Sequence, residues 1–190
     1  MKFVILLILI AVVVLWMVGA FNALISLKNQ VVNAWKQIDV QLKRRHDLIP
    51  NLVNTVKGYM NFERSTLEAV ISARNKAVGA QGVAATAKAE GELTQALGRL
   101  FALSESYPEL KSSQNVLQLQ EELTSTENKI GFARQLYNDV ATQYNTKQAQ
   151  FPTSLVAGMA KASPAELWEI EDAAERAVPN VDLSLDQPKA

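Results

Sequence analysis

The chain opens with an unbroken apolar run. Residues 3–21 contain no charged or strongly polar side chain. A helix of about 19 residues rises by about 28 Å, which is close to the thickness of the hydrocarbon core of a bilayer. The run therefore predicts a transmembrane helix over residues 1–22.

A cleaved signal peptide is the alternative for the same run. Met1-Lys2 resembles a basic start, and Val18-Gly19-Ala20 resembles a small-residue cleavage site. The run is longer than a usual signal core, and the helical pattern continues past it without a break. Both features favour a retained anchor.

After the run, apolar positions recur every three or four residues, as is typical of a helix that buries one face against another helix. Continued through Leu67 and Ile71, this spacing predicts one helix over residues 3–76, which Gly79-Ala80-Gln81-Gly82 would end. The first part of this line consists of Leu24, Leu27, Val31, Ala34, Ile38, Gln41, Arg45, Ile49, Leu52, Val56 and Tyr59.

Further helices are predicted over residues 84–104, 108–150 and 164–178. Pro108 and Pro164 suit a first helical turn, and Ser163 suits the N-cap before it. Phe151-Pro152 ends the long third helix, and a short helix over residues 152–160 is compatible with the pattern. The bundle would then cover residues 23–178, and residues 179–190 are predicted to be an extended or disordered tail.

Composition supports an all-α fold. The chain has 190 residues, of which 48% are hydrophobic and 20% charged, and strand-type alternation is nearly absent. This size suits one domain with one hydrophobic anchor. Two long helices joined by a shorter one bury their apolar lines by packing antiparallel. We therefore predict an N-terminal transmembrane helix that continues into a long-helix antiparallel bundle of the four-helix type.

Charged residues interrupt the apolar lines. Arg45 lies on the line of the first helix, and Glu127 and Arg134 lie on that of the third. Glu63 and Arg74 are further candidates for the same interior cluster. A buried ion pair fixes the alignment of helices, often without adding stability. We interpret this set as a structural polar cluster; a ligand-binding or catalytic cluster is the alternative.

Pro50 stands inside the predicted first helix. It has no amide hydrogen, so the carbonyl of His46 loses its usual donor and the helix is expected to bend there. The freed carbonyl is a possible contact point.

The sequence offers little for catalysis. It contains no cysteine, and His46 is its single histidine, so no metal-ligand spacing occurs. No phosphate-binding or hydrolase motif is present. The net charge is zero and the basic run Lys43-Arg44-Arg45 is short, which argues against nucleic-acid binding. We expect no enzyme activity, cofactor or metal; an enzyme that uses the His46 region is a further alternative.

The same basic run bears on partners and topology. Lys43, Arg44, His46 and Asp47 are candidates for contact with a partner. Because cations favour the inner side of a membrane, Lys43, Arg44 and Arg45 tip the expected location of the bundle toward the cytoplasm.

Three blocks of sequence resemble the bacterial LemA family. The first runs over residues 29–59 and contains Arg44-Arg45-His46-Asp47-Leu48-Ile49-Pro50-Asn51-Leu52-Val53. The second is Tyr107-Pro108-Glu109-Leu110-Lys111, and the third runs over residues 122–152 and ends in Phe151-Pro152. The resemblance covers residues 1–160. Gly158-Met159-Ala160-Lys161 stands where members often carry an aromatic-rich stretch, while residues 179–183 are similar to the family's ending.

The resemblance implies a single-pass protein of the bacterial inner membrane with an antiparallel helical bundle and no established family activity. Relatives include magnetosome-associated proteins and proteins encoded near membrane metalloproteases. It is therefore compatible with a non-enzymatic scaffold that forms homo-oligomers or docks partners at the lipid bilayer. The alternative is an accessory factor of a membrane protease in quality control.

Overall fold

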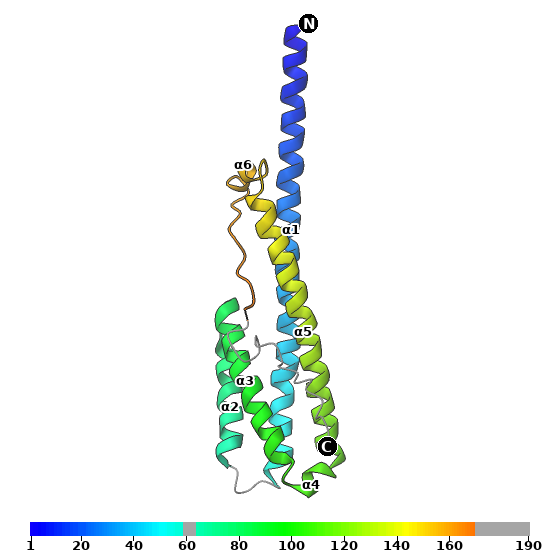
Figure 1. Ribbon diagram of the computed structural model, residues 1–190, viewed down its shortest axis with the longest axis vertical. Coiled ribbons are helices and arrows are strands. Elements are labelled where there is room, and N and C mark those ends of the chain that lie inside the picture. The colour runs from blue at the N-terminus through cyan, green and yellow to red at the C-terminus, as the bar shows by residue number, and fades with distance from the viewer. Residues whose placement is uncertain (59–63, 170–190) are drawn as a thin grey trace, which may run out of the picture.

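The computed structural model describes residues 1–58 and 64–169, and the described part is all-α (Figure 1). This confirms the predicted fold class. The helices, in chain order, are α1 (Lys2–Lys57), α2 (Arg64–Gly79), α3 (Val83–Ser104), α4 (Pro108–Lys111), α5 (Gln114–Ala149) and α6 (Ser154–Ala157).

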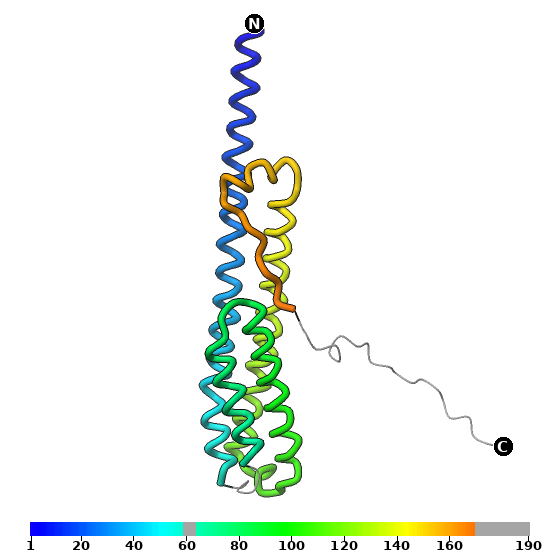
Figure 2. The backbone as a smooth tube through the Cα atoms, turned by 90° about the vertical axis from the view of Figure 1, so that its left-hand side faces the viewer, coloured from blue at the N-terminus to red at the C-terminus, as the bar shows by residue number. Residues whose placement is uncertain are grey.

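The molecule is a long rod whose axis is α1. In its lower half, α2 and α3 form a hairpin beside α1 and α5, which gives an antiparallel four-helix bundle (Figures 1 and 2). In its upper half, α1 and α5 pack against each other, and residues 161–169 run back along them (Figure 2). The antiparallel bundle predicted from the sequence is therefore confirmed.

The prediction of one helix over residues 3–76 is wrong. α1 ends at Lys57, and α2 turns back to pack against α1 and α3. The apolar spacing was misleading because α2 buries Leu67, Val70 and Ala73 in the same core that contains Ile49 and Leu52. A three-four pattern shows that a face is buried, but it does not show whether the helix continues or folds back. Tyr59 and Glu63 lie outside the described residues.

The predicted helix 84–104 corresponds to α3, whereas the predicted helix 108–150 is two helices. The chain turns at Ser112 and Ser113 between α4 and α5, where the amide of Ser113 donates to the carbonyl of Leu110. α6 lies inside the range predicted for a short helix after Pro152.

The prediction of a helix that starts at Pro164 is also wrong for its described residues, because residues 162–169 have no helical structure. Two asparagines of α5 hold this segment by its backbone. The Asn145 side chain bonds both the amide and the carbonyl of Ala165, at 2.7 and 2.8 Å. Asn138 does the same for Trp168, at 2.8 and 2.9 Å. A side-chain amide offers one donor and one acceptor group, so each asparagine replaces the helical partners of one residue.

Most of the apolar run at the start of α1 is exposed, from Phe3 to Trp16. Among the described helices, α1 is the one long and apolar enough to cross a membrane, a test that a signal sequence near the N-terminus also passes. Burial begins with Met17, Ala20 and Phe21, which are half-buried, and Leu24 is fully buried. The candidate span therefore continues into the bundle core within one helix.

α1 continues through Pro50, and the carbonyl that Pro50 deprives of a donor has found another. The guanidinium of Arg74 on α2 donates from Nε to the His46 carbonyl at 2.9 Å. The freed carbonyl is thus satisfied within the chain, and this contact joins α2 to α1. The bend at Pro50 stays a prediction.

We expect Arg74→Met to lower the free energy of unfolding by about 1.5–3 kcal/mol, the usual range for a hydrogen bond to a charged group. In a Pro50→Ala background the loss should be smaller, because the amide of residue 50 then donates to the same carbonyl. Urea unfolding in detergent of the parent, Arg74→Met, Pro50→Ala and the double variant measures this coupling. Arg64→Met, at an exposed position of α2, is the control. Equal losses in both backgrounds would contradict the assignment.

Candidate functional site

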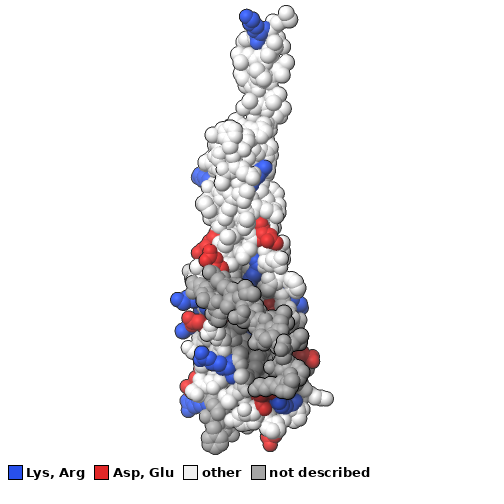
Figure 3. Space-filling view, viewed as in Figure 1, with Lys and Arg blue, Asp and Glu red and all other residues white. Residues whose placement is uncertain are grey.

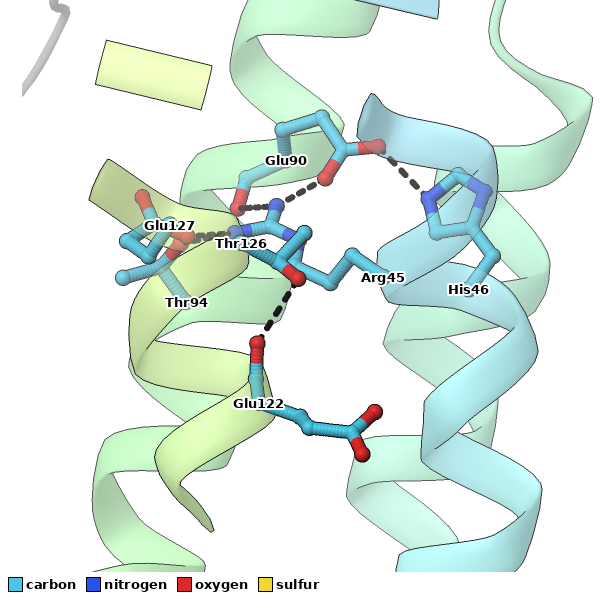
Figure 4. A network of polar contacts seen from close by, with 7 residues as sticks. All are labelled: Arg45, His46, Glu90, Thr94, Glu122, Thr126 and Glu127. Atoms are coloured by element: carbon cyan, nitrogen blue, oxygen red, sulfur yellow. Dashed lines mark hydrogen bonds and ion pairs between the residues drawn. The ribbon is translucent and has the colours of Figure 1, made fainter. Parts of the chain in front are cut away.

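Arg45 is the centre of a polar network inside the four-helix part of the bundle (Figure 4). Its side chain is 1% exposed. Nη2 contacts a carboxylate oxygen of Glu90 on α3, and Nη1 contacts a carboxylate oxygen of Glu127 on α5. Nη1 also donates to the Thr94 hydroxyl at 3.1 Å. One guanidinium thus connects three helices.

Glu90 is the second buried charge, with a side chain that is 0% exposed. Sequence reasoning missed it, although the signal was present. The buried residues of α3 are Thr86, Glu90, Leu93, Leu97, Leu100 and Ser104. Their spacing of four, three, four, three and four places Glu90 on the apolar line of its helix, as Arg45 is on that of α1.

His46 binds the other oxygen of the same carboxylate. Its Nε2 lies 2.7 Å from Oε1 of Glu90, so Arg45 and His46 hold one carboxylate from two sides (Figure 4). Burial by itself raises the pKa of Glu90, but the hydrogen bond from His46 and the positive charge of Arg45 outweigh it and lower that pKa below the usual glutamate range. The carboxylate is therefore held in its charged form.

Glu127 lies at the rim of the network. Its side chain is 39% exposed, while the neighbouring Thr126 occupies the buried position and donates its hydroxyl to the Glu122 carbonyl at 2.7 Å. A groove of about 240 Å³ opens beside Arg45 and Glu127, between α3 and α5. The predicted meeting of Arg45 and Glu127 is confirmed, at the edge of the interior.

The other predicted cluster members lie elsewhere. The guanidinium of Arg134 stacks over the Trp168 ring at 4.6 Å, at the level of the two-helix part. Arg74 on α2 binds the backbone carbonyl of His46 rather than a side chain of the network. A role for Glu63 lies outside the described residues.

The residues predicted to contact a partner separate into two groups. Lys43 and Asp47 form an exposed pair with Nζ 2.7 Å from Oδ2, and Arg44 is exposed beside them. The lysine hydrogen bond lowers the pKa of the Asp47 carboxyl. His46, in contrast, is buried against Glu90, so the expectation that it faces a partner is wrong.

The network's arrangement suits a structural role. Both terminal nitrogens of Arg45 and both oxygens of Glu90 are engaged with each other, with His46, or with Thr94 and Glu127. Within residues 1–58 and 64–169, no group of three or more histidine, cysteine, aspartate or glutamate side chains is arranged to hold a metal ion. What the network does is join α1, α3 and α5 by matched charges.

These features define an elongated antiparallel helical-bundle protein with one candidate membrane span at the start of its first helix. A family model described as the LemA family matches residues 34–183. The chain therefore belongs to the LemA family. The match runs past residue 160, so the family region includes more of the C-terminal part than the sequence blocks alone indicated.

Curated relatives agree with this assignment. The chain is 32% identical over 142 residues to Protein LemA of Metamycoplasma hominis, a match that covers 74% of this chain and 64% of the relative. It is 23% identical over 181 residues to Magnetosome protein MamQ 2 of Paramagnetospirillum magneticum, covering 82% and 66%. Magnetosome protein MamQ of Magnetospirillum gryphiswaldense is 24% identical over 163 residues, covering 72% and 60%. The chain thus spans somewhat less than two thirds of the length of these relatives.

We expect Glu90→Gln to lower the free energy of unfolding by about 3–5 kcal/mol, because it removes the buried partner of the Arg45 charge and leaves only the half-exposed Glu127 at the rim. The double variant Arg45→Met/Glu90→Leu should regain most of this loss, since neither charge remains. Thermal and urea unfolding followed by circular dichroism measures both.

Glu122→Gln is the matched control for this experiment. Glu122 lies one turn from the network, but its carboxylate points away from Arg45 (Figure 4). The same chemical change there should have little effect. A loss from Glu122→Gln as large as that from Glu90→Gln would show that the Arg45 contact is not the cause.

Proposed function

We propose that this protein is a non-enzymatic, membrane-anchored helical scaffold that self-associates or docks partner proteins at the bacterial membrane. The proposal is supported above all by the continuity of α1, in which the exposed apolar run and the bundle core are parts of one helix from Lys2 to Lys57. Because this helix is continuous, no flexible joint separates the candidate span from the bundle. The bundle would therefore be held at a fixed height from the bilayer.

The docking surface in this proposal is a groove between α1 and α5 near the middle of the rod. It has a volume of about 450 Å³, and its lining includes Val40, Phe132 and Leu136, with Lys36 and Lys129 among its other residues. The Phe132 side chain is 74% exposed. Exposed aromatic side chains in an apolar groove mark interaction sites more often than chance exposure does.

A second copy of the chain suits this groove. Two anchors in one bilayer hold their bundles parallel and at the same height. A two-fold axis along the membrane normal then brings the same face of both copies together, as a self-complementary interface requires. The anchor also raises the local concentration, so that weak lateral contacts become effective.

The test is photo-crosslinking in native membranes with benzoylphenylalanine in place of Phe132. Asn115, which is exposed near the other end of α5, is the control position. We expect Phe132-dependent adducts of twice the mass of the chain, or one defined adduct with another protein. A membrane protease in that adduct would favour the accessory role over self-association. Absence of any adduct that depends on position 132 would overturn the docking surface.

The proposal places the bundle on the cytoplasmic side of the inner membrane, because cations predominate in the part of α1 that follows the span. Because the sequence contains no cysteine, a single introduced cysteine can report on which side of the membrane the bundle lies. A cysteine introduced at Asn115 should resist a membrane-impermeant thiol reagent in intact cells and react after lysis.

A further inference from the structure

The chain reverses direction at the upper end of α5, and this reversal lies against the end of the candidate membrane span. We define residues 150–162, which include α6, as the membrane-proximal corner. Figure 1 shows α6 at the upper end of α5, beside α1. Ala157 and Ala160 belong to the same hydrophobic cluster as Phe21, Leu24 and Ile25. The corner therefore packs at the level where the apolar run ends.

The corner exposes large apolar side chains on its outer surface. Phe151 is 81% exposed, and Leu155 and Met159 are also largely exposed. They alternate with Thr153, Val156 and Ala160, which are buried. The inner side of the corner thus packs on the bundle. Its outer side presents three apolar side chains that the described part of the chain leaves exposed.

Charge around the corner has one sign. Residues 22–38 and 140–165 contain no aspartate or glutamate, and their charged residues are lysines, among them Lys28, Lys147 and Lys161. On the face shown in Figure 3, the part of the rod below the N-terminal helix carries blue basic side chains, and red acidic side chains begin only further down. Positive charge next to apolar side chains is the combination that anionic lipid surfaces attract.

We propose that the membrane-proximal corner is a second membrane-binding site, which inserts Phe151, Leu155 and Met159 into the interface of an anionic bilayer while the neighbouring lysines contact lipid phosphates. The proposal rests on the anchoring of the chain by its apolar run. If residues 3–21 occupy the hydrocarbon core, Phe21 lies at its edge, and the corner packs within about one helical turn, about 5 Å, of that edge. Interfacial apolar groups are buried to a depth of about 5–10 Å, so this position suffices.

A second contact would change what the anchor alone can do. One helix in a bilayer is free to rotate about its axis and to tilt. A contact at the corner, off the axis of α1, fixes which side of the rod faces the membrane and limits tilt. The groove at Phe132 would then be presented in a defined direction along the membrane plane.

The natural sequence contains no cysteine, so single cysteines can be placed and labelled in the full chain. We would label Leu155→Cys with the environment-sensitive fluorophore NBD. The protein is reconstituted into vesicles of phosphatidylcholine and phosphatidylglycerol in about a three-to-one ratio, to supply anionic lipid. A lipid with a nitroxide near its headgroup quenches labels in the interface, and iodide quenches labels in water.

We expect the label at Leu155 to emit at shorter wavelength, to be quenched by the nitroxide lipid and to be protected from iodide. A label at Asn115, near the far end of α5, should behave in the opposite way. Lys147→Gln/Lys161→Gln should reduce nitroxide quenching at Leu155 toward the level seen in pure phosphatidylcholine, whereas the control Lys111→Gln should leave it unchanged.

A label at Val12→Cys, within the apolar run, separates the two proposals. If Val12 is protected from iodide while Leu155 is as accessible as Asn115, the anchor is in place and the corner does not bind the membrane, which overturns this inference alone. If Val12 is itself accessible, the anchoring fails and the inference fails with it.

Discussion

The buried contact between Arg45 and Glu90 constrains the whole bundle. A guanidinium and a carboxylate removed from water each lose several kcal/mol of solvation, and only a partner in good geometry offsets this loss. Arg45 has two such partners, Glu90 on α3 and Glu127 on α5. If α3 slid by one turn along α1, Glu90 would lose contact with Arg45 and one charge would be buried alone. The apolar residues make the helices pack, whereas the charges determine where they pack.

Polar side chains set alignment elsewhere in the rod as well. Arg74 uses the carbonyl that Pro50 leaves free, so α2 is joined to α1 at one defined position. Asn138 and Asn145 fix the backbone of residues 165 and 168 along α5. Long helices with repetitive apolar faces are prone to slip, because many alignments bury similar area. These contacts remove that freedom, so the helices keep one alignment along α1.

The sequence was sufficient where a signal is local or periodic. The apolar run, the antiparallel bundle, the Arg45–Glu127 pair and the free His46 carbonyl all follow from spacing and from the chemistry of proline. It was insufficient where partners come from distant segments. Arg134 was assigned to the central cluster, but Trp168 stacks on it only because residues 161–169 return along α5. The helix start at Ser163-Pro164 is a good local signal that two asparagines of α5 override. Glu90, by contrast, could have been found from the heptad spacing of α3.

Acid unfolding tests the role of the Arg45–Glu90 contact most directly. Because the pKa of Glu90 is lowered in the folded protein, its contribution to stability is present above the usual glutamate pKa of about 4.3 and is lost as pH falls through the folded value. The measurement is the free energy of unfolding, from urea titrations in detergent between about pH 6 and pH 3, for the parent and Glu90→Gln proteins. Arg45, His46 and Glu127 are common to both proteins, so the stability difference between them reports the Glu90 carboxyl. We predict that the stability difference is large at pH 6 and shrinks steadily below about pH 4.3. A difference that stays constant down to pH 3 would show that the charge of Glu90 does not hold the bundle in register.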